Sequence, residues 1–358
     1  MTTTADPVPA AADLEAFLGR FVTDLGAALA GANIVLGDHL GLYGALAARQ
    51  PATPAEVAAA TGTDERFVQE WLCGQAAGGY IEYDPAAGTF WMTPAQAACL
   101  ADPASPTYVP GAFQIAASAY KDGARMLDAY RTGVGVGWHE HHQDLFDGTE
   151  RFFRPGYAAN LGDSWLPALD GVEGKLLSGA SVADVGCGHG ASTIIMAQAF
   201  PRSTFVGFDY HQGSIEHARA AAAAAGVGDR VRFEVAGAAD FPGEGYDLVA
   251  MFDCLHDIGD PVGAARHVRQ ALDADGTWLI VEPQAGDRIE VNLNPVGRVF
   301  YSASSLICVP ASRAQEVGLC LGAQAGAERI GAVVREGGFG RFRTATETPF
   351  NLVLEARP

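Results

Sequence analysis

Residues 182–192 read VADVGCGHGAS. An apolar run ends at Val185, and glycines at 186, 188 and 190 separate it from the helical sequence ASTIIMAQAF. Glycines let a backbone turn sharply and approach a ligand without a side chain in the way. Asp209 ends the next apolar run, 19 residues after Gly190, where a carboxylate can accept hydrogen bonds from both hydroxyls of a ribose. The pattern predicts a strand, a glycine loop and a helix that bind a nucleoside.

Strands and helices alternate from Ser181 to the end of the chain. The expected strands are SVADVG, STFVGFD, RVRFEVA, YDLVAMFD and GTWLIVEP, and two closing strands, GRFRTATE and FNLVLEAR, follow a long insertion at 283–312. Alternation of this kind is typical of a mostly parallel sheet covered by helices. We therefore expect an α/β fold, Rossmann-like, with a seven-stranded mostly parallel sheet whose last strand is antiparallel.

Residues 53–100 show the order of a winged helix. TPAEVAAATG predicts a short helix that Thr53 caps, with Pro54 in its first turn. TDERFVQEWLCGQAAGG predicts a longer helix, capped by Thr63 or Asp64, with Phe67, Val68, Trp71 and Leu72 on its inner face. YIEYDPAAGTFWMT predicts a hairpin that turns at DPAAG. The α/β domain is therefore expected to follow a mainly helical winged-helix domain.

The charge of the chain argues against nucleic acid as its partner. The net charge is −19, and the winged-helix region carries six acids against one base, Arg66. A helix that enters the major groove among phosphates needs the opposite sign. We expect a structural or dimerising winged helix, and no binding to nucleic acid or to an anionic membrane surface.

The chain is expected to have three parts: residues 1–104 as a helical, winged-helix dimerisation domain, 105–180 as a helical linker and lid region, and 181–358 as the catalytic domain. The N-terminal sequence lacks a basic start followed by an apolar core, and no window approaches 18 uninterrupted apolar residues. The six cysteines are scattered without a C-x-x-C pair. These features predict a cytoplasmic protein with reduced thiols.

A nicotinamide dinucleotide is the main rival ligand for the glycine loop. Its fingerprint is G-x-G-x-x-G, whereas residues 186–190 read G-x-G-x-G. Asp184 stands two residues before the first glycine, where its charge disfavours a pyrophosphate and favours a cationic aminoacyl group. The motif D-x-G-x-G-x-G resembles motif I of the class I S-adenosylmethionine-dependent methyltransferases. That resemblance implies S-adenosyl-L-methionine as the cofactor.

With the winged helix in front, the chain is similar to small-molecule O-methyltransferases of plants and bacteria, and an actinobacterial group of them has blocks like FFRPGYAAN, FDCLHDIGDP and FNLVLEARP. The resemblance implies a homodimer formed through the N-terminal domain and a small, aromatic or secondary-metabolite acceptor. It also implies contacts of the methionine part of the cofactor with the glycine loop, of the ribose with Asp209, and of the adenine with the segments after the second and third strands. The cofactor-binding residues would be Asp184, Gly186, Cys187, Gly188, Gly190, Asp209, Tyr210, Ala239, Asp240, Phe241, Phe252 and Asp253.

The segment FDCLHDIGDP, residues 252–261, follows the fourth strand. Open parallel sheets bind ligands beyond the carboxyl ends of their strands. In the resembling enzymes an H-D-x-x-D segment at this point carries the general base, and His256, Asp257 and Asp260 match it. A phenol, with a pKa of about 10, is mostly protonated at neutral pH, so an imidazole that takes its proton would assist methyl transfer.

Glu282, at the end of the fifth strand, matches the acid beside the base in the plant enzymes. It is therefore the expected orienting partner of His256, with Asp257 as a third catalytic residue. A carboxylate behind an imidazole fixes its tautomer and favours the imidazolium that forms. The alternative is that His256 caps the turn that follows, as Asp260 is expected to do before Pro261.

A metal site is not expected. His139 and His142 could share one face of a helix, but a third ligand at a suitable spacing is missing. Some methyltransferases of this fold bind iron partly through the histidine at position 256, and the second ligand histidine that they need is absent from residues 283–312. The candidate residues of the acceptor pocket are Trp138, His139, His142, Phe153, Arg154, Tyr157 and Asn294.

Two other functions stay open at this point. The same fold could methylate carbon or nitrogen, or catalyse a reaction other than methyl transfer. A winged-helix regulator that senses the cofactor without catalysis is the third possibility. The sequence does not disclose the acceptor, because residues 105–165 and 283–325 contain no transferable motif.

Overall fold

The computed structural model describes residues 10–358. These residues form two compact units, one ending at Ala117 and the other running from Ser118 to Pro358, and helix α6 (Pro110–Lys121) crosses the boundary. Each unit is described separately below. The three-part division with boundaries after residues 104 and 180 stays a prediction.

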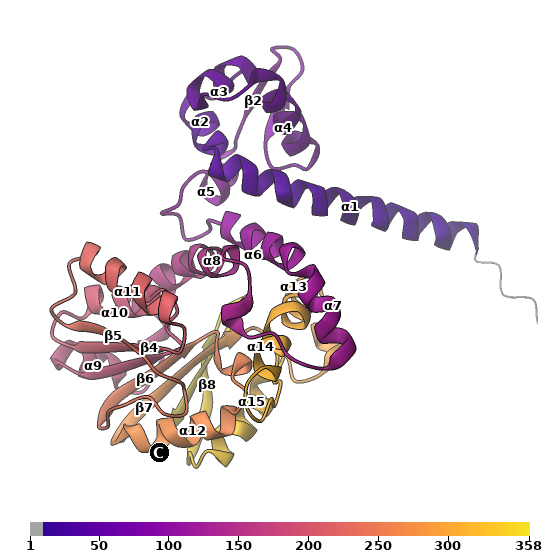
Figure 1. Ribbon diagram of the computed structural model, residues 1–358. Coiled ribbons are helices and arrows are strands. Elements are labelled where there is room, and N and C mark those ends of the chain that lie inside the picture. The colour runs from indigo at the N-terminus through magenta and orange to yellow at the C-terminus, as the bar shows by residue number, and fades with distance from the viewer. Residues whose placement is uncertain (1–9) are drawn as a thin grey trace, which may run out of the picture. The chain divides into compact units, whose positions relative to one another are not determined.

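The first unit is mainly helical. It contains helices α1 (Ala11–His39), α2 (Leu42–Arg49), α3 (Pro54–Thr61), α4 (Glu65–Ala77) and α5 (Pro94–Leu100). Strands β1 (Glu82–Asp84) and β2 (Thr89–Trp91) form an antiparallel hairpin after α4. The order of helix, helix and hairpin confirms the expected winged helix (Figure 1).

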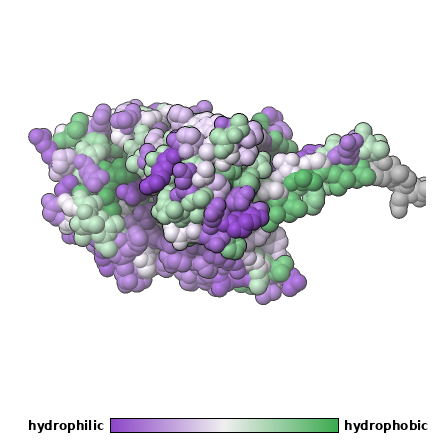
Figure 2. All heavy atoms as spheres, turned by 90° about the horizontal axis from the view of Figure 1, so that it is seen from above, coloured by the Kyte–Doolittle hydropathy of each residue, from purple (hydrophilic) through white to green (hydrophobic). Residues whose placement is uncertain are grey.

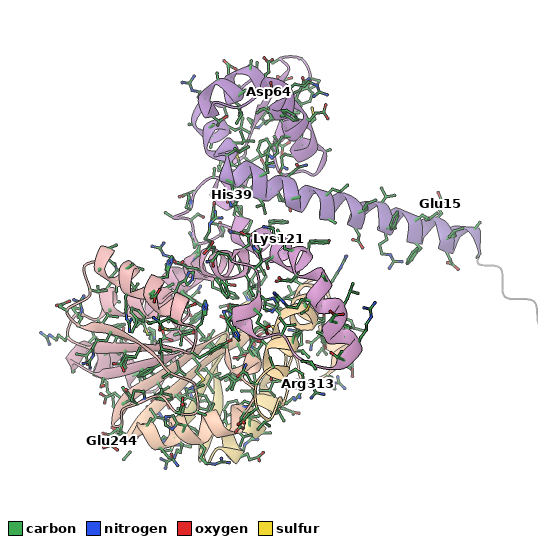
Figure 3. The ribbon with its side chains drawn as sticks, viewed as in Figure 1. Glu15, His39, Asp64, Lys121, Glu244 and Arg313 are labelled. Carbon is green, nitrogen blue, oxygen red and sulfur yellow. The ribbon has the colours of Figure 1, made fainter. Side chains whose placement is uncertain are left out.

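Local side-chain contacts fix both central helices of the winged helix. The hydroxyl of Thr53 accepts a hydrogen bond from the Glu56 amide at 3.3 Å, and Glu56 accepts one from the Thr53 amide at 2.8 Å, so that α3 begins with a capping box. Asp64 caps α4 (Figure 3), and its carboxylate accepts hydrogen bonds from the backbone amides of Arg66 and Phe67. Trp71 is buried as expected, whereas Phe67 is 79% exposed, so its expected place on the inner face is wrong. Phe67 lies in the first turn of α4, on the side away from the core.

Helix α1 carries an apolar face that the first unit leaves open. Within the first unit only Ile34 and Gly37 of this helix are buried. Figure 2 shows the hydrophobic side chains along α1, while acids such as Glu15 (Figure 3) are interspersed with them. The exposed large apolar residues of the helix are Leu14, Phe17, Leu18, Phe21, Val22, Leu25, Leu29 and Leu36.

By length and composition α1 is the one helix within residues 10–358 that could cross a membrane. We expected no membrane span because no window approaches 18 uninterrupted apolar residues, and that criterion does not detect this helix. A mostly buried core helix and a signal sequence near the N-terminus pass the same test, so one such helix is weak evidence for a membrane span. The cytoplasmic location stays a prediction.

The second unit begins with helices that precede the sheet. These are α7 (Gly123–Thr132), the short η1 (Trp138–Glu140), α8 (Asp144–Asn160), the π-helical turn η2 (Leu161–Trp165) and α9 (Val172–Ser178). The alternating part follows as β3 (Ser181–Val185), α10 (Ala191–Ala199), β4 (Thr204–Asp209), α11 (Gln212–Ala224), β5 (Val231–Val235), β6 (Tyr246–Phe252), η3 (Leu255–Asp257), α12 (Pro261–Ala271) and β7 (Leu272–Pro283). The insertion holds η4 (Ile289–Asn292), α13 (Pro295–Ala303), η5 (Ser304–Cys308) and α14 (Val309–Arg313), and the chain closes with α15 (Gly326–Glu336), β8 (Arg341–Glu347) and β9 (Asn351–Arg357).

The sheet of the second unit has seven strands within the described chain, in the order β5-β4-β3-β6-β7-β9-β8. The first five of these strands in space pair in parallel, and β9 runs antiparallel to both β7 and β8. The expected α/β fold, with its mostly parallel sheet and antiparallel last strand, is confirmed. The order places β3, which leads into the glycine loop, between β4 and β6, so that the three loops following these strands meet at one edge.

Helices cover both faces of this sheet (Figure 1). Successive residues of a strand point to opposite faces, so Val182 of β3 belongs to the core under α10 and α11, whereas Ala183 belongs to the core under α12 and α15. Tyr157 and Trp165, from the segment before the sheet, lie in the first of these cores. The end of α8 is thereby packed beside the strand ends that carry the glycine loop.

Candidate active site

A cavity of about 600 Å³ lies in the second unit, at the carboxyl ends of β3, β4 and β6. Its size is within the usual range for a site that holds a small molecule. Most of the residues expected at the cofactor and acceptor sites are on its wall. Those residues are Gly186, Cys187, Gly188, Asp209, Tyr210, Ala239, Asp240, Phe252, Asp253, Asp257, Trp138, His139, Phe153, Arg154 and Tyr157.

The glycine loop takes its shape from positive φ angles, which are 77° at Gly186, 53° at Gly188 and 80° at Gly190. L side chains rarely adopt this conformation. A Cβ atom at Gly190 would lie 2.6 Å from the ring of Phe233, so this glycine, which is not on the cavity wall, is needed for packing. A Cβ atom at Gly188 would meet no atom within 4 Å. The backbone at Gly188 therefore borders open space, as close approach to a ligand requires.

Asp209 holds the loop from the end of β4. Its carboxylate accepts hydrogen bonds from the amide of Gly188 at 3.0 Å and from the amide of His211 at 2.8 Å. Burial raises the pKa of Asp209, and the two backbone amides act in the opposite direction. Because Asp209 lies on the cavity wall, its remaining acceptor capacity faces a ligand there.

Asp184 lies inside the sheet and not on the cavity wall. Its Oδ2 accepts hydrogen bonds of 2.6 Å from Ser192 and from Thr193, which fixes the start of α10. Its Oδ1 is buried without a hydrogen-bond partner among residues 10–358. Burial raises the pKa of Asp184 to about 6. The structure therefore places this residue behind the loop, in a supporting position, and not in the contact with the ligand that was expected.

The segments expected to surround an adenine ring are divided between cavity and core. Tyr210 and Ala239 line the cavity, and Asp240, which also lines it, accepts a hydrogen bond from the amide of Gly237 at 2.9 Å. Phe241, in contrast, is buried in the core, where its ring lies 5.2 Å from that of Phe208. The expected contact of Phe241 with the ligand is thus replaced by packing under the cavity.

The end of β6 joins the sheet to α8. Asp253 has a φ of 51°, and its Oδ2 accepts a hydrogen bond of 2.9 Å from the hydroxyl of Tyr157. Burial and then the charge of Glu282 raise the pKa of Asp253 to about 7. The Tyr157 ring also lies 5.3 Å from that of Phe252. Helix α8 is therefore held over the cavity by residues that sequence patterns placed in separate sites.

His256 lies between two carboxylates. Its Nδ1 contacts Glu282, whose other oxygen accepts the amide of Leu255 at 2.9 Å, and its Nε2 lies 3.1 Å from Oδ1 of Asp257. Burial lowers the pKa of His256, but the charges of Asp257 and Glu282 outweigh that effect and hold the pKa well above its ordinary value. Both ring nitrogens of an imidazole can donate only when the ring is protonated. The ring thus has a hydrogen bond to Glu282 at Nδ1 and an ion-pair contact to Asp257 at Nε2, and Oδ1 of Asp257 is buried without a hydrogen-bond partner among residues 10–358.

Asp257 separates this imidazole from the cavity. His256 is 4% exposed, and of the three expected catalytic residues only Asp257 is part of the cavity wall. Burial raises the pKa of Asp257, and the charge of His256 acts against that rise. The thiol of Cys308, whose pKa burial raises to about 11, closes the same side of the ring. Asp260 caps α12 through the amide of Gly263 at 2.8 Å, as expected.

Two residues expected in the acceptor pocket lie elsewhere. His142 is on the surface beside Asp144, with its Nδ1 3.4 Å from a carboxylate oxygen, and Asn294 caps α13 through the amide of Gly297 at 2.9 Å. Between His139 and His142, His141 contacts Asp122 at 2.9 Å with a side chain that is nearly fully buried. These corrections share a cause, because polar residues near helix starts pair locally with the chain.

The cavity wall also includes residues that were not expected there. Glu150 and Thr149 reach it from α8, each four residues before an expected residue, Arg154 and Phe153 respectively, and Ser214 and His189 also line it. The helical spacing of Glu150 and Thr149 from Arg154 and Phe153 could have indicated that they reach the same cavity. The stretch from Ala314 to Val317, with a φ of 70° at Val317, is also part of the wall, and no sequence signal indicates it.

Two family models match this chain. Residues 176–311 match the model described as a methyltransferase domain, and residues 27–102 match the model described as an Rv2258c-like winged HTH domain. The first match contains β3, the glycine loop, Asp209 and the segment around His256. The second contains the winged helix.

A curated relative is the O-demethylpuromycin-O-methyltransferase of Streptomyces alboniger. It is 31% identical over 188 residues, which are 50% of this chain and 45% of that protein. The match thus spans less than half of the length of the relative.

Solved structures resemble the chain over nearly its whole length. The mitomycin 7-O-methyltransferase MmcR covers 97% of it with a TM-score of 0.70 and 21% identity, and all of that chain is matched. PigF with SAH has a TM-score of 0.71 at 17% identity, with 98% of this chain and 100% of that chain covered. Human N-acetylserotonin methyltransferase in complex with SAM has a TM-score of 0.69 at 17% identity, with coverage of 100% and 99%. At these identities the likeness shows a shared fold.

Proposed function

Residues 176–311 of this chain belong to the methyltransferase domain family, and we propose that the protein transfers a methyl group from S-adenosyl-L-methionine to a hydroxyl of a small acceptor. One observation carries the proposal. The glycine loop, Asp209 and Asp257 line the same 600 Å³ cavity, and His256 and Glu282 stand behind Asp257. A nucleoside site and an acid–base group that share one cavity are what such a transfer needs.

The loop and Asp209 fit the proposed cofactor. The backbone at Gly188 leaves open space, and Asp209 presents a carboxylate to the hydroxyls of a ribose. Asp240 and Asp253 add further acceptors, and the wall carries more acids than bases. A cationic sulfonium nucleoside suits such a wall better than a pyrophosphate does. When bound, the cofactor supplies an electrophilic methyl group.

The proton of the acceptor hydroxyl passes to the carboxylate of Asp257, which becomes a neutral acid and returns the proton to water after the product leaves. Asp257 is the one member of the Asp257–His256–Glu282 group on the cavity wall of the described chain. The positive charge of His256, whose Nε2 lies 3.1 Å from Asp257, holds that carboxylate in place, and Glu282 holds the ring from the other nitrogen. In this proposal Asp257 takes the role of general base that was expected of His256. The remaining acceleration comes from holding nucleophile and methyl group in line.

The acceptor site is the part of the cavity below α8. Phe153 and Tyr157 stack with ring centroids 5.9 Å apart, and Trp138 lies beside Phe146 on the same side. Aromatic side chains of this kind favour a flat aromatic acceptor. Arg154 at the rim adds a positive charge for an anionic or phenolic oxygen.

The proposed active form is a homodimer. The open face of α1 carries eight large apolar side chains, from Leu14 to Leu36, that a second copy would bury. Exposed contiguous apolar surface of this size marks an interaction site. The Rv2258c-like winged HTH domain, whose acids outnumber its bases, supports a dimerising role over a nucleic-acid-binding one.

Calorimetry and a methylation assay test the proposal. Full-length protein should bind S-adenosyl-L-methionine with measurable heat, show no heat with NADH, and release S-adenosylhomocysteine when a panel of phenols and polyketide-like alcohols is supplied. Mass spectrometry of the product from a methyl-labelled cofactor identifies the acceptor atom. Binding of NADH without binding of S-adenosyl-L-methionine would overturn the proposed cofactor. A label found on carbon or nitrogen would overturn the proposed hydroxyl acceptor.

A further inference from the structure

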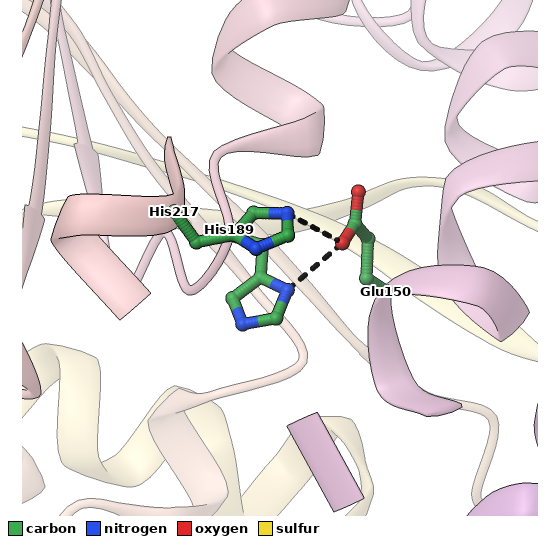
Figure 4. Close-up of side chains that lie close together, drawn as sticks. All are labelled: Glu150, His189 and His217. Atoms are coloured by element: carbon green, nitrogen blue, oxygen red, sulfur yellow. Dashed lines mark hydrogen bonds and ion pairs between the residues drawn. The ribbon is translucent and has the colours of Figure 1, made fainter. Parts of the chain in front are cut away.

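Three side chains of the kinds that bind metal ions meet beside the cavity. Glu150 comes from α8, His189 from the glycine loop and His217 from α11 (Figure 4). One ligand atom of each, namely a carboxylate oxygen, Nδ1 of His189 and Nε2 of His217, lies within 4.8 Å of the other two. None of the roles described above uses this group of three.

Both imidazoles turn a nitrogen toward the same carboxylate oxygen, as Figure 4 shows. Oε2 of Glu150 lies 2.8 Å from Nδ1 of His189 and 3.3 Å from Nε2 of His217. The two rings are stacked, with centroids 3.9 Å apart and planes 14° apart. The lone pairs of two nearly parallel rings do not converge, so His217, which is 47% exposed, would have to tilt for one ion to replace both N–H protons.

We propose that Glu150, His189 and His217 form a binding site for a divalent transition-metal ion such as Zn²⁺. Two imidazoles with one carboxylate form a donor set that suits Zn²⁺ and its neighbours among the transition metals and is a poor set for Mg²⁺ or Ca²⁺. Glu150 and His189 line the cavity, so the fourth position of a tetrahedral ion would face it. That position would be filled by water or by an oxygen of a molecule in the cavity.

The electrostatic surroundings support a cation at this place. Oε2 of Glu150 lies between Nδ1 of His189 and Nε2 of His217, so a carboxylate oxygen already stands where a cation would need a negatively charged ligand. Asp209, which interacts with His189, adds a second negative charge. Arg154 is the opposing cation, and it is exposed on α8, where solvent screens it.

A bound ion would fasten three segments that are far apart in the sequence. His189 lies between Gly188 and Gly190, while Glu150 and His217 precede and follow it by 39 and 28 residues. The ion would thus hold the glycine loop to one helix on each side. This inference does not depend on methyl transfer, since the three residues would hold the ion whatever the cavity binds.

A second group of possible ligands, His256, Asp257 and Cys308, must be told apart from the first. There the imidazole already has a carboxylate at each nitrogen, and the thiol, with a pKa of about 11, keeps its proton at neutral pH. A metal bound there would have a sulfur ligand, and Co²⁺ bound to a thiolate absorbs strongly in the near ultraviolet. The Glu150 site has no sulfur ligand.

The test uses full-length protein stripped with EDTA and titrated with Co²⁺, followed by visible absorption and by calorimetry. We expect one equivalent to bind, with visible bands of tetrahedral or five-coordinate Co²⁺, without the near-ultraviolet thiolate band, and with displacement by Zn²⁺. Thermal unfolding should shift to higher temperature with one equivalent of Zn²⁺. Absence of saturable binding would overturn the proposal.

Matched variants locate the ion. Glu150→Gln and His217→Ala should each weaken Co²⁺ binding by at least tenfold, and His217, which is 47% exposed, can be replaced without loss of the fold. His142→Ala is the control, because His142 is 43% exposed and also lies beside one carboxylate, without a third ligand among the described residues. Equal affinity in all three variants, or loss of binding in Cys308→Ser instead, would place the ion elsewhere and overturn the proposal.

Discussion

Nε2 of His256 lies 3.1 Å from Oδ1 of Asp257, and it is Asp257 that reaches the cavity wall. An imidazole at the mouth of a sheet was expected to meet the acceptor directly. The structure instead surrounds it with Glu282, Asp257 and Cys308, so that its charge is held by acids on both sides. A proton from the cavity therefore meets a carboxylate first.

Asp257→Asn should lower kcat by about 10²–10⁴-fold, because the amide keeps the shape of the side chain but cannot accept a proton. His256→Ala should also lose activity. Binding of S-adenosylhomocysteine should be unchanged in both variants, since both keep Asp209, which holds the glycine loop. Calorimetry and single-turnover assays check these outcomes. Normal turnover in Asp257→Asn would show that Asp257 has only a structural role, and normal turnover in His256→Ala would remove the base assignment altogether.

Gly188→Ala and Gly190→Ala should separate ligand binding from stability. Both glycines have positive φ, so each alanine is strained by about 1 kcal/mol or more. The new methyl group at position 188 meets open space and would collide with the bound cofactor, whereas at position 190 it lies 2.6 Å from Phe233. We expect at least tenfold weaker binding with modest destabilisation for the first, and about 1–3 kcal/mol of further destabilisation for the second. Chemical denaturation and calorimetry measure the two effects, and equal losses of stability would contradict the assignment.

Asp184→Asn should flatten the pH dependence of stability. Burial raises the pKa of Asp184 from 3.8 to about 6, so the folded state binds this proton more tightly than the unfolded state does. The resulting stabilisation is complete below pH 4 and is lost as the pH rises through 6, and it amounts to about 3 kcal/mol at 1.36 kcal/mol per unit of pKa. Urea unfolding between pH 4.5 and 7.5 would measure it. Parallel curves for the variant and the parent protein would contradict the prediction, and Asp229→Asn, an exposed substitution, is the control.

Charges on the open face of α1 should dissociate the proposed dimer. Phe17→Asp combined with Phe21→Asp places two carboxylates on the face that the proposed dimer would bury. Loss of the two aromatic side chains from that interface should cost several kcal/mol of the free energy of association. Light scattering after size exclusion should then give the mass of one chain. Ala27→Asp, on the polar side of the same helix, should leave the mass of the parent protein unchanged. A monomeric parent protein would refute the dimer.

Sequence patterns predicted the fold because strong local signals agreed with each other. The glycine loop, the apolar runs and the capped helices of the winged helix each indicated one element, and their alternation indicated a mostly parallel sheet, although not the order of its strands. The same patterns placed Phe67 on the wrong side of α4, because a residue in the first turn of a helix can face either way until its neighbours are known.

The site was predicted less completely. Asp209, Asp257 and Tyr157 were found from motifs, yet no pattern shows that Asp184 faces Ser192 and Thr193 or that Phe241 faces the core. Such orientations depend on packing between elements. The pairing of Glu150 with His189 and His217 joins three separate segments, and sequence spacing carries no information about it.

The hydrogen bond from Tyr157 to Asp253 has a consequence for which residues can occupy position 253. The φ of 51° there suits glycine, asparagine and aspartate, and the tyrosine hydroxyl requires an oxygen acceptor on a short side chain. Glycine satisfies the first requirement alone, and glutamate, with its longer side chain, satisfies neither. A saturation library at this codon, selected for folded and active protein, should return aspartate and asparagine and very little else.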